Sequence, residues 1–279
     1  MLDGRISMSS SSLTILRSGA RAATRVDRAA IVAELRRLLP RLESTAASAR
    51  ALPFGLTALD AHLPHGGLAI GALHEVVPQT HGDTPAAFGF LAALLARFAK
   101  DHARTNRPLL FVASHRALAD HGRPHGHGLN RLGLDPARLI LVETANEKQA
   151  LWAIEEALRS GAPAAIGGAI AKLDLKTSQR LQLTAGEAGL PLLLLRPAKV
   201  AEASAAATRW RIVAAQAARD RFGLLARTRW NARLERCRNG RTGEWLVEFD
   251  HGAYRFSLAA ALADPALSRG AGAMFRRAG

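Results

Sequence analysis

The stretch that decides the fold reads Gly71-Ala72-Leu73-His74-Glu75-Val76-Val77-Pro78-Gln79-Thr80-His81-Gly82-Asp83-Thr84. Its first part, Gly71 to Val76, is a mostly apolar run that favours a core strand. A helical pattern of apolar residues follows from about Pro85 to Lys100. A strand, a short loop and a long helix in this order are typical of an α/β protein.

The loop lies where a nucleotide-binding protein carries the sequence Gly-Lys-Thr. Such a loop neutralises the β- and γ-phosphates with backbone N–H groups and one lysine. Here the same positions are Gly82, Asp83 and Thr84. Because an aspartate places negative charge against a polyanion, triphosphate binding is disfavoured. We therefore predict a degenerate loop without a nucleotide cofactor, in which Thr80 or Asp83 caps the helix.

Beyond this unit, short apolar runs alternate with helical patterns. Strands are expected at 108–113, 139–143, 164–169 and 190–195, and helices at 146–160 and 178–188. Strands of this kind form a mostly parallel sheet with helices on both faces. The predicted fold class is α/β.

After residue 200 apolar and polar residues alternate, as in antiparallel strands. Such strands are expected at 208–213, 230–238 and 244–249, with Cys237 in a sheet position. Asn239-Gly240 is a strong hairpin signal between the last two. We expect this C-terminal hairpin to extend the parallel sheet.

The two ends of the chain differ from the core. Residues 1–26 predict a disordered basic tail, and 27–50 an amphipathic helix. The core domain is expected at 51–262, and a basic flexible tail at 263–279. The N-terminal helix has three candidate contacts, namely another copy of the chain, another protein or its own sheet.

Composition limits the class of protein. The formal net charge of +15 indicates a polyanionic partner such as nucleic acid; the alternative is a composition rich in Ala, Arg and Leu that reflects a high-GC genome. A single cysteine fits a reducing cytoplasm. Since neither a transmembrane run nor a signal-peptide core is found, we expect a cytoplasmic protein without membrane contact.

Four stretches, in this order, carry a resemblance to a known family. They are Gly55-Leu56-Thr57-Ala58-Leu59-Asp60 with Gly66-Gly67-Leu68, then Gly71-Ala72-Leu73-His74-Glu75-Val76, then Gly128-Leu129-Asn130-Arg131-Leu132-Gly133-Leu134-Asp135-Pro136-Ala137-Arg138-Leu139, and Arg236-Cys237-Arg238-Asn239-Gly240 with Gly243-Glu244-Trp245-Leu246-Val247-Glu248. Together they resemble the RecA recombinase core, and more closely the RecA-like ImuA family of bacterial mutagenesis cassettes. The resemblance covers about residues 50 to 260, and it implies a RecA-like P-loop NTPase core.

The resemblance also implies a function and partners. Members of the family are cytoplasmic, DNA-damage-induced proteins of the SOS response that act in translesion synthesis and mutagenesis. The implied partners are a catalytically inactive Y-family-like polymerase subunit of the ImuB type and an error-prone replicative-type polymerase. RecA and single-stranded DNA are further candidates, and a homo-oligomer is left open.

RecA-type ATPases need catalytic groups that this sequence lacks. The resemblance places Asp83 at the P-loop lysine, in a loop that is also one residue short at its first glycine. The water-activating glutamate would stand at Ser114 or His115. The metal-binding acid would fall near Gly168 or Ala169. Thr84 retains the magnesium-binding hydroxyl, but we predict that the chain is not an enzyme.

Histidines gather in the Gly- and Pro-rich connection 114–128. They are His115, His121, His125 and His127. Imidazole is the commonest metal ligand, but no cysteine and no regular spacing accompany these residues. We predict a solvated loop and no metal.

Arginines are dense between 209 and 241, with tryptophans among them. The candidates for nucleic-acid or partner binding are Lys172, Lys176, Arg180, Arg209, Trp210, Arg211, Arg219, Arg221, Arg227, Arg229 and Trp230. Guanidinium groups bridge phosphates and indoles stack on unpaired bases, which suits single-stranded DNA. By analogy with RecA-type folds, residues 172–180 and the segment 199–227 would face DNA. The alternative is a solvated sheet face, with Trp210 and Trp230 in the core.

Three functions remain from the sequence. The leading hypothesis is a non-catalytic adaptor that bridges the mutagenic polymerase subunits. The second is a stand-alone module that binds single-stranded DNA. The third is a cell-division inhibitor that shares the degenerate RecA-like fold.

Overall fold

The structure is a computed structural model that describes residues 50–259, apart from 102–105, 201 and 220. The expected N-terminal tail, almost all of the helix at 27–50 and the C-terminal tail lie outside the described residues. The domain boundaries proposed from the sequence therefore stay a prediction.

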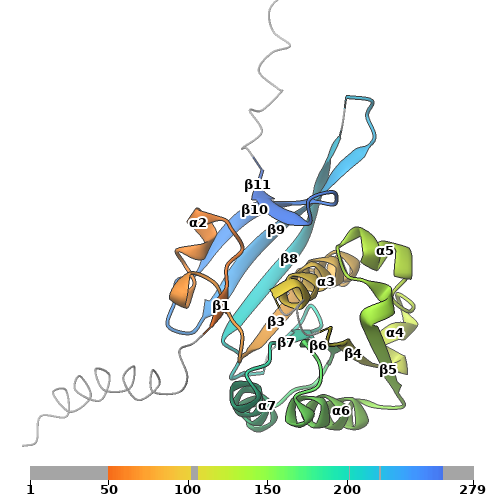
Figure 1. Cartoon of the computed structure of the whole chain (residues 1–279), viewed down its shortest axis with the longest axis vertical. Coiled ribbons are helices and arrows are strands. Elements are labelled where there is room, and N and C mark those ends of the chain that lie inside the picture. Colours follow the sequence, from red (N-terminus) through yellow and green to blue (C-terminus); the bar gives the residue numbers. More distant parts are fainter. Residues whose placement is uncertain (1–49, 102–105, 201, 220, 260–279) are drawn as a thin grey trace, which may run out of the picture. The chain divides into compact units, whose positions relative to one another are not determined.

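The larger sheet in the described part of the chain has nine strands (Figure 1). In chain order they are β3 (Leu73–Pro78), β4 (Leu109–Ser114), β5 (Leu139–Thr144), β6 (Ala165–Ala169), β7 (Leu192–Leu195), β8 (Thr208–Arg219), β9 (Leu225–Cys237), β10 (Gly243–Asp250) and β11 (Arg255–Leu258). Across the sheet the order is β11-β10-β9-β8-β3-β7-β6-β4-β5. Pairing is parallel from β8 through β3 to β5, and antiparallel from β8 to β11. The predicted α/β class and the mostly parallel sheet are confirmed.

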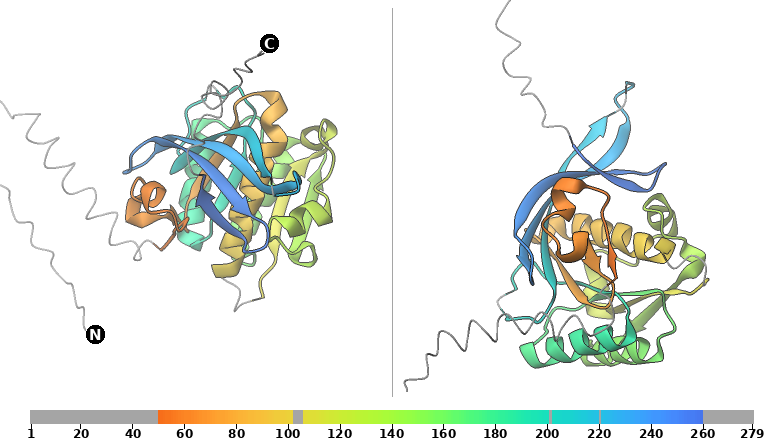
Figure 2. Two further views of the ribbon diagram at one scale, coloured as in Figure 1. Left: turned by 90° about the horizontal axis from the view of Figure 1, so that it is seen from above. Right: turned by 60° about the vertical axis from the view of Figure 1, so that its left-hand side comes forward.

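Helices cover both faces of the parallel strands (Figure 2). α3 (Thr84–Asp101) packs on one face, and α6 (Glu147–Ser160) and α7 (Leu175–Ala188) pack on the other. Successive side chains of a strand point to opposite faces. Leu193 of β7 therefore joins the core under α3, whereas Leu192 and Leu194 join the core under α6 and α7. A strand buried on both faces must be apolar throughout, as the leucine run of β7 is.

Glycine in β6 is required by close packing. A Cβ at Gly167 would lie 2.7 Å from Phe111 Cδ2 and 2.9 Å from Leu95 Cδ1. β6 is thus held close to α3, and no larger residue fits at this position.

A small sheet precedes β3. β1 (Ala51–Leu52) pairs with β2 (Leu68–Ala69), with α2 (Thr57–Asp60) and the 3-10 turn η1 (Pro64–Gly66) between them. The Asp60 carboxylate accepts hydrogen bonds from the backbone N–H groups of Phe54, Gly55 and Leu56. These bonds fix the turn that places Phe54 in the core under α3.

The C-terminal strands are longer than the alternation predicted. β3 pairs with β8 as far as Ile212, and β10 pairs with β9 from Thr228 onward. Beyond these points β8 and β9 still pair, with Ala218 opposite Arg227 and Arg219 opposite Leu225, and residues 221–224 lie outside both strands. We call residues 213–219 and 221–227 the arm (Figure 1, Figure 2). A bulge between Ala215 and Ala218 lies near its base. The expected hairpin between β9 and β10 is confirmed.

Local structure differs from expectation at several helices. The connection at 114–128 contains two short helices, α4 (His115–Ala119) and α5 (Gly126–Arg131). α7 begins at Leu175 rather than Ser178, because the Asp174 carboxylate accepts the N–H of Thr177 at 2.6 Å and caps the helix. No helix among the described residues is long and apolar enough to cross a membrane.

Candidate functional site

The loop between β3 and α3 is held together by the carboxylate of Asp83. The loop consists of residues 79–83, of which the 3-10 turn η2 (His81–Asp83) leads directly into α3. Asp83 Oδ2 accepts the backbone N–H of Thr80 at 3.0 Å and its hydroxyl at 2.6 Å. Its Oδ1 accepts the backbone N–H of Ala214 at 3.0 Å. Asp83 thus joins its own loop to the base of the arm.

These hydrogen bonds also fix the charge of Asp83. The bond from the Thr80 hydroxyl lowers the pKa of the carboxyl group; burial opposes it, and the N–H groups of Ala214 and Thr80 add to the lowering. The side chain is therefore an anion at neutral pH. The expectation that Thr80 or Asp83 caps this end is met by Asp83, which accepts the N–H of Thr80 as in a capping box.

The Thr84 hydroxyl is engaged within the same turn. Its Oγ1 donates to the carbonyl oxygen of His81 at 2.7 Å. This hydroxyl therefore already has an acceptor in the backbone of the loop.

Two further parallel strands, β4 and β6, end near the same edge of the sheet. β4 ends at Ser114, whose hydroxyl accepts the N–H of Ala117 at 3.3 Å and caps α4. β6 ends at Ala169, which has no side chain that binds a metal. Within the described residues no group of three histidines, cysteines or acids is arranged to hold a metal ion.

Glu143 is a carboxylate near this edge that the sequence did not single out. Its oxygens accept from Arg123 Nε at 2.5 Å and Nη2 at 2.9 Å, and His115 Nδ1 lies 3.5 Å away. Mainly because of the Arg123 hydrogen bond, the pKa of Glu143 is lowered. A general base works best with a pKa near the operating pH, so this bidentate ion pair is poorly suited to activating water.

Four of the arginines proposed for nucleic acid form cross-strand ion pairs. Arg209 contacts the fully buried Glu75 at 2.8 Å. Arg211 forms a bidentate pair with Glu235, at 2.5 Å and 3.1 Å.

Arg227 and Arg229 share a further carboxylate. Glu248 Oε1 accepts from Arg229 Nε at 2.7 Å, and Glu248 Oε2 lies 3.2 Å from Arg227 Nη1. Arg227 also lies 3.4 Å from Asp250. These guanidinium groups are engaged in neutralising buried or half-buried acids, which the density of arginine in the sequence did not reveal.

The two candidate tryptophans are core residues. Trp210 is 0% exposed and Trp230 1% exposed, and both pack against Phe90 of α3. The core interpretation is confirmed, and the proposal that these indoles stack on bases is corrected. Alternation places them on the inner face of β8 and β9, where no unpaired base reaches them.

The remaining candidates are spread over two places. Arg180 of α7 pairs with Glu155 of α6 at 3.1 Å, and Lys172 and Lys176 are exposed beside it in the chain. Arg219 and Arg221 lie at the tip of the arm, where Arg219 Nη1 donates to the Gly223 carbonyl at 2.6 Å.

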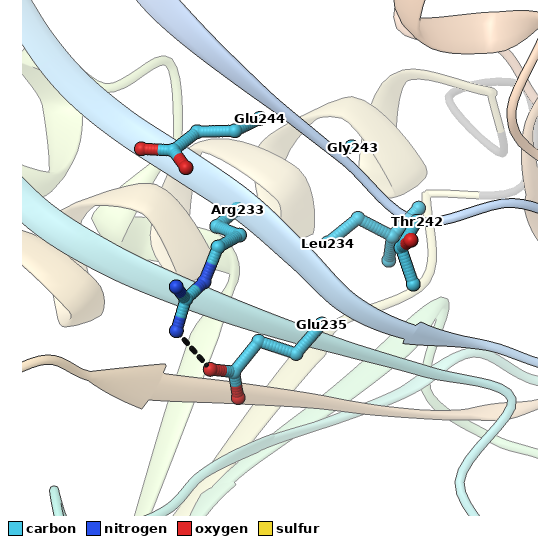
Figure 3. A pocket seen from close by; sticks show the side chains of 6 residues that line it. All are labelled: Arg233, Leu234, Glu235, Thr242, Gly243 and Glu244. Carbon is cyan, nitrogen blue, oxygen red and sulfur yellow. Dashed lines mark hydrogen bonds and ion pairs between the residues drawn. The ribbon is translucent and has the colours of Figure 1, made fainter.

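A shallow pocket of about 490 Å³ lies on the outer face of β9 and β10 (Figure 3). Its lining consists of Arg233, Leu234, Glu235, Thr242, Gly243 and Glu244. Arg233 donates to Glu235 across it at 2.6 Å. Because its cation is already paired, this pocket offers no converging groups for a ligand.

A second hollow of about 440 Å³ lies at the base of the arm, and we call it the arm groove. It is bounded by the first turns of α3, by α5 and by the arm. Its lining consists of Pro85, Ala86, Gly89, Gly128, Arg131, Leu132, Ala214, Ala215, Ala217, Arg227, Thr228, Arg229, Trp230 and His251. His251 connects two sides of the groove. Its Nε2 lies 2.9 Å from Thr228 Oγ1, and its Nδ1 lies 2.8 Å from the Arg131 carbonyl oxygen.

Comparison with known proteins identifies the family. The chain is 36% identical over 233 residues to Protein ImuA of Caulobacter vibrioides strain NA1000 / CB15N. The match covers 76% of this chain and 90% of that relative. This chain belongs to the ImuA family. Protein ImuA of a second strain, ATCC 19089 / CIP 103742 / CB 15, matches to the same extent.

Membership in the ImuA family confirms the resemblance read from the four sequence stretches. No general family model matches the chain. The structure of this ImuA family member shows three features that the sequence did not: the contacts of Asp83, the ion pairs on the outer sheet face, and the arm with its groove.

Proposed function

We propose that this chain is a non-catalytic accessory protein of DNA-damage-induced mutagenic translesion synthesis. In this role it acts in the cytoplasm as an adaptor between error-prone polymerase subunits. Membership in the ImuA family supports the pathway. The observation that carries the non-catalytic part is the Asp83 carboxylate, which occupies the lysine position and binds Thr80 and Ala214.

A RecA-like core with a lost nucleotide site is part of the proposal. A strand–loop–helix unit, β3, η2 and α3, lies inside the parallel part of the sheet, where phosphate-binding loops of α/β proteins are found. The anionic Asp83 repels a triphosphate from this loop, and the strand ends at Ser114 and Ala169 supply no acid.

The experiment is a magnesium-dependent ATP binding and hydrolysis assay on the full chain. We expect neither binding nor turnover in the wild type or in Thr84→Ala. We also expect Asp83→Lys to lower thermal stability without creating ATP binding, since it removes the three hydrogen bonds of the carboxylate. Wild-type turnover that Thr84→Ala abolishes would overturn the non-catalytic proposal.

The proposed partners follow from the family. They are the catalytically inactive Y-family-like subunit of the ImuB type and the error-prone replicative-type polymerase of the same cassette, with RecA as a further candidate. The adaptor role requires that the purified chain binds at least one polymerase subunit directly. Failure of both to bind in a size-exclusion or titration experiment would refute it.

A stand-alone module for single-stranded DNA has weaker support. Such modules combine exposed cations with exposed rings. Here Arg209, Arg211 and Arg229 are held by carboxylates, and Trp210 and Trp230 are buried. Direct DNA contact is therefore not part of the proposed function.

A further inference from the structure

The arm groove and the arm tip lie along one ribbon. Ala217, at the edge of the groove, is two residues from Arg219 at the tip. Among the described residues no strand pairs with the outer edges of the arm, because the pairing of β3 stops at Ile212 and that of β10 at Thr228. A partner that enters the groove therefore meets the tip as well.

The groove is hollow because its walls carry small side chains. Ala86 and Gly89 of α3 and Ala214 and Ala215 of β8 are among its lining residues. Gly128 of α5 is open as well, since a Cβ there would meet no atom within 4 Å. A volume of about 440 Å³ with this lining is in the range of pockets that accept apolar groups.

The charges of the groove argue against a polyanion. Arg229 is bound to Glu248, and Arg227 lies near both Glu248 and Asp250. Arg131 lines the groove and is exposed, and among the described residues its side chain makes no ion pair with a carboxylate. One available guanidinium matches a single carboxylate better than a phosphate backbone, which needs a track of cations.

The tip of the arm presents large apolar side chains to solvent. Phe222 is 72% exposed and Leu224 is 65% exposed. Arg221 lies over the Phe222 ring, 4.7 Å from its centroid. Exposed aromatic and aliphatic groups beside arginine are the residue types that anchor protein interfaces.

We propose that the arm groove and the arm tip form one docking surface for a protein segment that combines apolar side chains with a carboxylate. The apolar side chains enter the groove and cover Phe222 and Leu224, and the carboxylate pairs with Arg131. The proposal rests on the adaptor function, and its occupant is a segment of the inactive polymerase-like subunit.

The test fills the groove without disturbing the fold. Gly128→Leu adds a side chain where there is room, and in a helix leucine is favoured over glycine by about 1 kcal/mol. The matched control is Gly186→Leu on α7, where a Cβ makes only an ordinary 3.7 Å contact with the Gly71 carbonyl. Titration with the fluorescently labelled polymerase-like subunit should show affinity reduced about tenfold or more in Gly128→Leu and unchanged in the control.

A second variant tests the tip. Phe222→Ala with Leu224→Ala should also weaken binding of the subunit, by about fivefold or more. Its control is Leu183→Ala on α7, which removes a side chain that is 63% exposed elsewhere on the surface. A labelled oligothymidine titrated against all five proteins should show no difference between the variants and the wild type.

Any result other than weaker binding of the subunit by both variants, with oligothymidine binding unchanged, overturns the inference. If the wild type binds the subunit and both variants bind equally well, the docking surface is wrong while the adaptor function stands. A loss in only one of the two variants refutes a single surface. Loss of oligothymidine binding alone assigns the arm to nucleic acid. If the wild type binds neither polymerase subunit, the proposed function fails together with the inference.

Discussion

The parallel and the antiparallel strands of the sheet differ in the residues on their two faces. The parallel strands are covered by helices on both faces and are almost wholly apolar, as β7 shows. The antiparallel strands β8 to β10 bury one face under α3, and no helix of the described residues covers the other face. On that open face arginine and glutamate side chains from neighbouring strands pair with one another.

The comparison teaches how to interpret a run of arginines. In the sequence the stretch 209–241 has the composition of a nucleic-acid-binding surface. In the structure Arg211 pairs with Glu235 and Arg229 with Glu248, across adjacent strands. Cross-strand pairs of opposite charge stabilise a solvated sheet face. The charge of a segment therefore indicates an anionic partner only after the pairs within the sheet have been discounted.

The largest expected effect concerns the buried face of the antiparallel part. Trp210→Ala should lower the free energy of unfolding by about 3–5 kcal/mol, because it leaves a cavity beside Phe54 and Phe90. Urea denaturation followed by circular dichroism measures the change. Trp152→Ala is the matched control, since Trp152 on α6 is 66% exposed and its removal should cost less than about 0.5 kcal/mol. Equal costs for the two variants would contradict the assignment of Trp210 to the core.

The second effect lies at the seam where β3 of the parallel part meets β8. His74 is fully buried there, 2.8 Å from both Thr208 Oγ1 and the Ala69 carbonyl. A carbonyl only accepts, so His74 Nε2 donates to it and Nδ1 accepts from the Thr208 hydroxyl. Burial, opposed by the hydrogen bond to Ala69, lowers the pKa of His74 from 6.5 to about 4.

This shift predicts the direction of a pH dependence. Between about pH 6.5 and pH 4 the unfolded state binds a proton that the folded state does not, so stability falls as the pH falls. The loss reaches about 3 kcal/mol at the lower end. Urea midpoints measured across this range should fall more steeply for the wild type than for His74→Gln, which cannot titrate. Parallel curves for the two proteins would show that His74 does not cause the dependence.

The smallest of the three effects concerns the open face. Burial alone would raise the pKa of Glu248, but hydrogen bonds from Arg229 and Arg227 outweigh it and hold the pKa below its usual value. Glu248→Gln should cost about 1–3 kcal/mol, because both guanidinium groups lose their ionised acceptor. The pair of the exposed Arg233 with the half-buried Glu235 is the comparison, and Arg233→Ala should cost less than about 0.5 kcal/mol. If Arg233→Ala is the more costly change in chemical denaturation, the ranking of these pairs by burial is wrong.

Much of the fold was predictable from local pattern. The apolar runs placed all the parallel strands, since a strand buried on both faces has no alternative composition. Asn239-Gly240 indicated the hairpin, in which Asn239 adopts a positive φ of 60°. The short helices α4 and α5 were missed, since they lack the apolar periodicity that longer helices show.

The sequence by itself determined the α/β class, the family and the presence of an aspartate, Asp83, in the loop between β3 and α3. Each of these depends on residues that are close together in the chain or on their order. Only the tertiary structure decided what Asp83 contacts, which arginines are neutralised, and that Trp210 and Trp230 are buried. These contacts join residues that are far apart in the chain. Asp83 and its partner Ala214 are 131 residues apart, and Arg229 and its partner Glu248 are 19 residues apart. Local sequence patterns do not encode contacts between such distant residues.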